Sequence, residues 1–140
     1  MDLDLAREIL AQQPFSRLLG ARVTEFGKGE ATLELDIREE LLQQYGFVHG
    51  GVLSYAADNT LTLAAGTVAG AGLITSGFTI DYLRPATGEV LRAHGRVVRA
   101  GRTRVVTRCD LITIDAAGEQ TLCAVAQGNI AVIEPNGEQR

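Results

Sequence analysis

In several segments of the chain, apolar and polar residues alternate with the two-residue period of a half-buried β-strand. The pattern is clearest over residues 31–37, where Leu33, Leu35 and Ile37 alternate with polar neighbours. Glycine-containing or proline-containing turns separate the alternating segments. These signals predict six strands, over residues 21–26, 31–37, 73–83, 90–99, 103–114 and 121–133.

Two other segments have a helical pattern. Residues 3–12 place apolar side chains at helical spacing, and Pro14 follows as a stop signal. Residues 50–68 are rich in alanine and leucine, and their apolar positions occupy most sides of a helix of about five turns. A helix that is apolar on most sides is buried, so we expect this one to lie at the centre of the molecule.

The order of these elements indicates the fold class. Strands gathered into runs and set apart from one long helix are typical of an α+β protein, with an antiparallel sheet wrapped around that helix. No linker, repeat or low-complexity tract interrupts the 140 residues. We therefore expect a single domain over residues 1–140, in which residues 1–14 form an N-terminal helix.

Composition narrows the class of protein. Hydrophobic residues make up 46% of the chain, enough for a substantial core, and the net charge of −4 argues against a nucleic-acid partner. The acidic N-terminus does not resemble a signal peptide, and the uncharged run after Asp58 is too polar for a membrane span. These features predict a cytoplasmic protein with two free core thiols, Cys109 and Cys123. With only two histidines, the chain cannot form a histidine-rich metal site, and we expect no metal.

One carboxylate interrupts the apolar helix. Asp58 is the only formally charged residue between Glu40 and Asp81, and an unpaired carboxylate is costly in apolar surroundings. The side chain either points into solvent from an incompletely covered helix or faces a functional site, where perturbed carboxylates tend to cluster.

The start of the same helix offers hydrogen-bond donors. His49, Gly50 and Gly51 precede its first turn, where backbone N–H groups have no partner within the helix and the helix dipole is positive. Such a terminus suits an anion or a developing oxyanion. Asp58 lies two turns beyond Gly51, on the same side of the helix. His49 is either part of this chemistry or a capping residue.

Basic residues gather in one region. Seven of the 13 lysines and arginines fall within residues 84–108. The planar guanidinium of arginine suits phosphate groups, so this region either binds a phosphorylated ligand or forms a solvated strand face paired with the acidic residues 30–40.

Three motifs together resemble a known family. Y-G-F-V-H-G-G-V-L at 45–53, D-N at 58–59 and I-D-Y-L-R-P-A at 80–86 are similar to the hotdog-fold acyl-CoA thioesterases of the phenylacetyl-CoA thioesterase type. The resemblance covers residues 15–133. It implies hydrolysis of an aryl- or medium-chain acyl-CoA without a cofactor. It also implies that subunits pair through their sheets into dimers or tetramers, with active sites at the subunit interface.

The resemblance gives each residue of the helix start a role. Asp58 matches the catalytic carboxylate, which acts as nucleophile or as general base. The Gly50 backbone N–H matches the group that polarises the thioester carbonyl, and Gly51 matches the glycine that allows close approach. His49 matches a histidine that positions this loop or the thioester.

The remaining correspondences are more distant. Thr75 lies where relatives often carry a hydroxyl residue that reaches the partner subunit's site. Gln43 stands where the family usually has asparagine, and its longer side chain carries the same amide. Three arginines are candidates for the phosphates of coenzyme A: Arg84, Arg99 and Arg102.

Two rival functions are also compatible with the sequence. A hotdog-fold hydratase or dehydratase also pairs a histidine with a carboxylate, although its usual H-F-P-G motif is replaced here by H-G-G. A non-catalytic acyl-CoA-binding or sensing module would not need Asp58. Hydration of crotonyl-CoA would indicate the first, and tight binding without thiol release would indicate the second.

Overall fold

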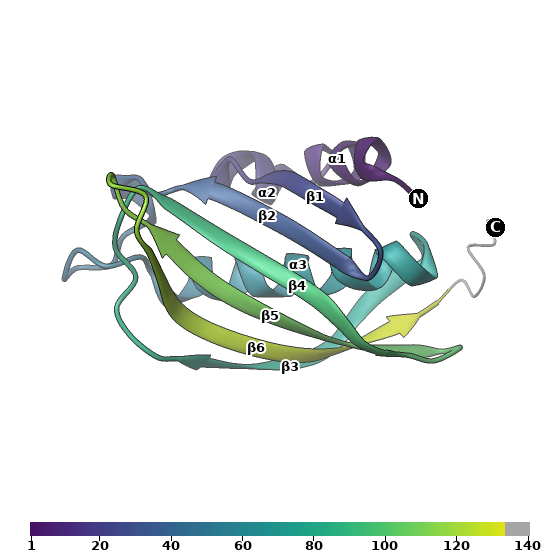
Figure 1. The fold of residues 1–140 in the computed structure, drawn as a ribbon. Coiled ribbons are helices and arrows are strands. Elements are labelled where there is room, and N and C mark those ends of the chain that lie inside the picture. The colour runs from purple at the N-terminus through teal and green to yellow at the C-terminus, as the bar shows by residue number, and fades with distance from the viewer. Residues whose placement is uncertain (134–140) are drawn as a thin grey trace.

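The fold is described by a computed structural model over residues 1–133 (Figure 1). Three α-helices, one short 3-10 helix and six strands are found in that part of the chain. In chain order they are α1 (Leu3–Ala11), α2 (Pro14–Leu19), β1 (Arg22–Gly27), β2 (Glu30–Asp36), η1 (Glu39–Leu41), α3 (Gly50–Ala69), β3 (Leu73–Tyr82), β4 (Val90–Ala100), β5 (Arg104–Ile114) and β6 (Gln120–Val132). The predicted strands and the long helix are confirmed to within a few residues.

The six strands form one antiparallel sheet in the order β1-β2-β4-β5-β6-β3. The strand that follows α3 in the chain therefore crosses to the far edge, where β3 pairs with β6. The sheet curves around α3, which lies along its inner face (Figure 1). This is the predicted α+β architecture of the hotdog fold.

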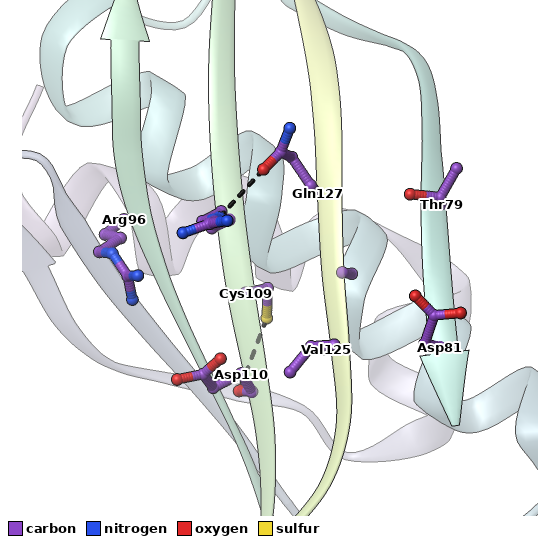
Figure 2. A pocket seen from close by; sticks show the side chains of 9 residues that line it. Thr79, Asp81, Arg96, Cys109, Asp110, Val125 and Gln127 are labelled. Carbon is purple, nitrogen blue, oxygen red and sulfur yellow. Dashed lines mark hydrogen bonds between the residues drawn. The ribbon is translucent and has the colours of Figure 1, made fainter. Parts of the chain in front are cut away.

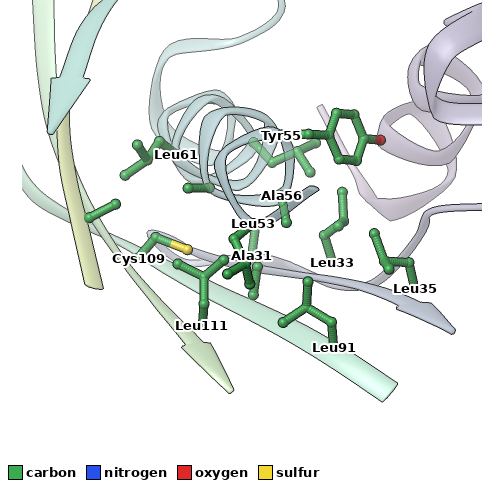
Figure 3. Close-up of a cluster of buried hydrophobic side chains, with 14 of the residues drawn as sticks. Ala31, Leu33, Leu35, Leu53, Tyr55, Ala56, Leu61, Leu91, Cys109 and Leu111 are labelled. Atoms are coloured by element: carbon green, nitrogen blue, oxygen red, sulfur yellow. The ribbon is translucent and has the colours of Figure 1, made fainter. Parts of the chain in front are cut away.

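The core lies between the sheet and α3 (Figure 3). Strand side chains alternate, so that every second residue of β2, β4 and β5 points toward the helix. Leu33, Leu91 and Leu111 on the strands and Leu61 on α3 are all 0% exposed. Full burial of one such side chain is worth about 1.5–3 kcal/mol. The apolar composition of α3 thus follows from its position against the sheet.

The N-terminal segment differs from the prediction. Pro14 does not simply end the first helix but is the first residue of a second one, α2. Proline suits this position because the first helical N–H has no intrahelical partner. The α2 helix covers Tyr55 of α3, whose hydroxyl donates to Ser16 Oγ at 2.6 Å. The ring of Phe15 meets the Tyr55 ring edge to face, with centroids 5.4 Å apart.

Other predictions can be placed on this fold. Both cysteines are buried and free. No helix within residues 1–133 is long and apolar enough to cross a membrane. The last seven residues of the predicted domain, 134–140, lie outside the described part of the chain.

Candidate active site

The N-terminus of α3 carries a backbone N–H donor, that of Gly50, which has no hydrogen-bond partner in the described part of the chain. His49 is the N-cap residue, and its ring atom Nδ1 accepts a hydrogen bond from the Gly51 N–H at 2.8 Å. The His49 carbonyl accepts from Val52 and Leu53, which begins the helical hydrogen bonding. The Gly50 N–H makes no hydrogen bond to any residue from 1 to 133. Because α3 is 20 residues long, its dipole adds partial positive charge at this N–H.

A hollow of about 370 Å³ lies beside this helix start. Its lining is mostly apolar and comes from the loop before α3, from the first turn of α3, from the end of β3 and from the loop that follows β3: Gln43, Phe47, Val48, Gly50, Leu53, Tyr82, Leu83, Arg84, Pro85 and Ala86. Three of the predicted site residues therefore meet here. The guanidinium of Arg84 donates to the Leu122 carbonyl at 2.9 Å, which anchors it at the rim.

Gln43 is held by its own loop. Its backbone N–H donates to the Phe47 carbonyl at 2.7 Å, and its side-chain oxygen accepts from the Tyr45 N–H. The amide NH2 group makes no hydrogen bond to another residue in the described chain. A glutamine fixed through its oxygen can offer this NH2 group to a ligand.

Asp58 belongs to a second polar cluster, between α3 and β3. Its Oδ1 atom accepts a hydrogen bond from Thr75 Oγ1 at 2.7 Å. The hydroxyl of Thr62 lies 2.8 Å from that of Thr75. A hydroxyl has one proton, so Thr75 donates to Asp58 and accepts from Thr62. Asp58 is half-buried, and Oδ2 makes no hydrogen bond to any described residue.

The two clusters are separated within one chain. Gly50 and Asp58 are eight residues apart on α3, which corresponds to about 12 Å along the helix axis. Asp58 does not line the hollow beside Gly50. The sequence predicts the amide and the carboxylate on the same side of one helix, and in the structure they lie in two separate clusters along α3.

Two predicted arginines lie far from the helix start. Arg102 lines a different hollow, together with Val68, Ala69 and Gly70 at the C-terminal end of α3, and Arg99 lies near the end of β4 beside it. The length of α3 separates this region from Gly50 by about 30 Å. Gly51 is close to the site, but its N–H is already bonded to His49.

Comparison with known proteins identifies the family. The family model of the thioesterase superfamily matches residues 45–118, a span that contains the helix start, Asp58 and every lining residue of the hollow except Gln43. The chain belongs to the thioesterase superfamily. Among its relatives, human acyl-coenzyme A thioesterase 13 is 32% identical over 117 residues, which are 81% of this chain and 80% of that one. This chain is thus a thioester hydrolase.

Solved structures agree with this assignment. A thioesterase family protein from Silicibacter pomeroyi has a TM-score of 0.84 and 29% identity, over 90% of this chain and 93% of that one. Zebrafish thioesterase superfamily member 2 has a TM-score of 0.80 and 25% identity, over 94% and 99% of the two chains. The hotdog fold and the thioesterase family are therefore both confirmed.

The structure of this thioesterase also places one residue at the site that the sequence analysis did not assign. The Tyr82 hydroxyl, at the end of β3, donates to the Gly50 carbonyl at 3.1 Å and lies 2.8 Å from Ser54 Oγ. Tyr82 stands in the I-D-Y-L-R-P-A motif that carried the family resemblance. The motif marks the residue, but only the packing of β3 beside α3 gives it a partner.

A further hollow of this thioesterase, of about 380 Å³, lies on the outer face of the sheet, away from α3 (Figure 2). Its lining includes Arg96, Asp110 and Gln127, and none of the predicted site residues.

The side chain of Cys109 turns toward the core (Figure 3). Burial raises the pKa of its thiol, and the charge of Asp110 adds to this effect. Cys109 is thus not suited to act as a nucleophile.

The described residues also lack a group of side chains that could bind a metal ion. Within residues 1–133 no group of three or more His, Cys, Asp or Glu side chains is placed to hold a metal ion.

Proposed function

We propose that this thioesterase hydrolyses an aryl- or medium-chain acyl-CoA in the cytoplasm, at a site shared by two copies of the chain. The observation that supports this most directly is the unbonded Gly50 N–H at the start of α3, which borders a mostly apolar hollow. A polarising donor at the mouth of an apolar hollow suits a thioester carbonyl with an attached acyl group. The activity named for the human relative agrees with an acyl-CoA substrate.

The mechanism begins with the carbonyl. The thioester oxygen accepts a hydrogen bond from the Gly50 N–H, assisted by the free NH2 group of Gln43, and these donors stabilise the negative charge that develops on it. Asp58 then acts in one of two ways. It either attacks the carbonyl carbon and expels the CoA thiolate, leaving an anhydride that water hydrolyses, or it takes a proton from the attacking water.

Asp58 is prepared for either role by its neighbours. The hydrogen bond from Thr75 fixes the carboxylate through Oδ1 and leaves Oδ2 free to react. Because Thr75 is hydrogen-bonded to Asp58 of the same chain, both residues would contribute to the same site. In a site shared with the helix start of the partner subunit, Thr75 would thus reach the partner's site, as the family resemblance implies.

A second copy is needed because Asp58 and Gly50 of one chain are about 12 Å apart along α3. The free edge of β3 supports such a pairing, since nothing in the described chain pairs with that side of the strand. Antiparallel pairing of two β3 strands would set the two α3 helices side by side in opposite directions. The helix start of one copy would then lie beside Asp58 of the other. We propose a dimer of this kind, or a tetramer built from two such dimers.

The coenzyme A phosphates would bind arginine side chains. Arg84 lies at the rim of the hollow that contains Gly50, so we propose it as a phosphate ligand from the same chain. Arg99 and Arg102 lie beyond the opposite end of α3. These two would contribute only from another copy of the chain.

Replacement of Asp58 by asparagine tests the proposal. We expect Asp58→Asn to abolish hydrolysis, because the amide can neither attack the carbonyl nor accept the proton of water. The Thr75 hydroxyl can still donate to the amide oxygen, so folding and assembly should be unchanged. Release of free thiol from a panel of aryl- and alkyl-CoAs measures the activity and finds the preferred acyl group.

The outcomes separate the proposal from its rivals. Wild-type turnover by Asp58→Asn on several acyl-CoAs would refute the role of this carboxylate. A hydratase would hydrate crotonyl-CoA without releasing thiol, and a binding module would bind acyl-CoA and release nothing.

A further inference from the structure

The hydroxyl of Tyr82 makes two contacts at the first turn of α3. It donates to the Gly50 carbonyl at 3.1 Å and lies 2.8 Å from Ser54 Oγ. A phenolic hydroxyl has a single proton, so Ser54 donates to Tyr82 and Tyr82 donates to Gly50. The Tyr82 side chain is 52% exposed, so these two bonds are not a requirement of a buried core.

The peptide unit between Gly50 and Gly51 is therefore bonded at both ends. Its carbonyl oxygen accepts from Tyr82, and its N–H donates to His49 Nδ1 at 2.8 Å. Donation to the oxygen of a peptide unit strengthens the donor character of its N–H, because hydrogen bonds in a chain polarise one another. Ser54, Tyr82, this peptide unit and His49 thus form one directed chain of hydrogen bonds.

This chain of hydrogen bonds determines which nitrogen of His49 carries the proton. Since Nδ1 accepts the Gly51 N–H, the proton of the neutral ring lies on Nε2. The other tautomer would place two N–H groups against each other. A neutral His49 therefore presents an N–H donor at Nε2 rather than a lone pair.

We infer that Tyr82 is a positioning residue, which orients the Gly50–Gly51 peptide and through it holds His49 as the Nε2–H tautomer. Its kinetic consequence rests on the proposed function. The ring contributes separately, because a Cβ at Gly50 would lie 3.4 Å from the Tyr82 hydroxyl oxygen and 3.5 Å from Cζ. The ring packs against the helix start, and the hydroxyl orients the peptide.

The test is Tyr82→Phe, which removes the hydroxyl and keeps the ring. Tyr45→Phe is the matched control, since Tyr45 is 74% exposed and its hydroxyl bonds to no described residue. We expect Tyr82→Phe to lower kcat about tenfold and to change KM less than about twofold, because the donor geometry matters most when charge develops on the oxygen. Tyr45→Phe should change neither constant.

A spectroscopic readout tests the same inference without substrate. The chain has only two histidines, so the ring ¹⁵N signals of His49 can be assigned by comparison with a His94→Gln variant. At about pH 8, where a typical imidazole is neutral, wild-type His49 should show an acceptor Nδ1 and a protonated Nε2. Tyr82→Phe should move both signals toward the average of the two tautomers and shift the Gly51 amide proton upfield.

The two proposals fail in different ways. Unchanged His49 and Gly51 signals together with an unchanged kcat in Tyr82→Phe would overturn the role of Tyr82. Absence of thiol release by the wild-type enzyme would overturn the proposed function alone, and the NMR comparison would still decide the role of Tyr82.

Discussion

At the scale of single residues, Cys109 links the stability of the fold to pH. Its side chain is 1% exposed beneath the sheet, and burial raises the pKa of the thiol well above its ordinary value. The unfolded chain then loses this proton at a lower pH than the folded chain does. The free energy of unfolding should therefore fall by about 1.4 kcal/mol per pH unit once the pH exceeds about 8.5.

Urea unfolding between pH 7.5 and pH 9.5 measures this slope. Cys109→Ala is the matching variant, because it removes the titrating group from the same place. We expect it to be less stable than wild type at pH 7.5, owing to the lost sulfur contacts, but to lose most of the decline at higher pH. A decline as steep in Cys109→Ala as in wild type would contradict this origin.

Residues of the candidate site differed in how well their sequence signals predicted them. Asp58 stands out because it is the only formal charge in a long apolar segment, and Gly50 because it begins a helix. The Thr75–Asp58 hydrogen bond could not be predicted from the sequence, because it depends on the position of β3 relative to α3. The Tyr82–Gly50 bond depends on the same relative position. Sequence periodicity specifies the face of an element but not which residues meet across two elements.

At the scale of elements, alanine replacements of two glycines, one in α3 and one in β4 packed against it, should change the free energy of unfolding in opposite directions. A Cβ at Gly95 of β4 would lie 2.9 Å from both Cγ2 and the carbonyl oxygen of Thr60, whereas a Cβ at Gly66 of α3 would meet Met1 and Phe26 at 3.6 Å and 3.7 Å. We expect Gly95→Ala to lower the free energy of unfolding by about 1–3 kcal/mol through overpacking. Gly66→Ala should raise it by about 0.5–1 kcal/mol, because alanine favours the helix.

Denaturant titrations of both variants at one pH give the comparison. Gly95→Ala tests the space between β4 and α3, and Gly66→Ala tests helix propensity at a position where a methyl group has room. Stabilisation by Gly95→Ala would show that β4 can move away from α3 without loss. Destabilisation by Gly66→Ala would show that the space beside Met1 and Phe26 is too small.

The elements themselves were largely predictable, because alternation in the strands and apolar residues around α3 both follow from a sheet packed on one helix. Two features were not. Pro14 is compatible with the end of one helix and with the start of another, and only the contact of Ser16 with Tyr55 shows why α2 forms. The position of β3 at the edge of the sheet is a matter of topology, which the alternation of single strands does not contain.

At the scale of the whole molecule, the two edges of the sheet differ in whether a helix lies beside them. The β1 edge lies beside α1, whose Arg7 donates from Nε to the Val23 carbonyl at 3.0 Å. The β3 edge has no such cover within residues 1–133. A long exposed strand edge is a template for pairing with another chain. This asymmetry agrees with the proposed dimer, in which two copies would pair through β3, next to Thr75 and Asp58.

A variant that lacks the Gly50 N–H donor can test the proposed shared site. Gly50→Pro removes the backbone N–H at the first helical position, where proline fits the helix. His49, the residue before it, already has φ −59° and ψ 135°, a conformation that proline allows in its predecessor. Gly50→Ala keeps the N–H, and its Cβ would make ordinary contact with Tyr82. We expect only the proline variant to lose about 100- to 1,000-fold in rate.

Mixing Gly50→Pro with Asp58→Asn tests whether the site spans two chains. In a mixed dimer, the intact Gly50 of the Asp58→Asn chain would face the intact Asp58 of the Gly50→Pro chain, giving one complete site. Random reassortment of equal amounts should restore about a quarter of wild-type activity, because half of the dimers are mixed and each has one working site of two. A site contained within one chain would give no recovery, since every site would then carry one of the two defects. Unfolding and refolding the two variants together, with separately refolded samples mixed afterwards as the control, makes the measurement by thiol release.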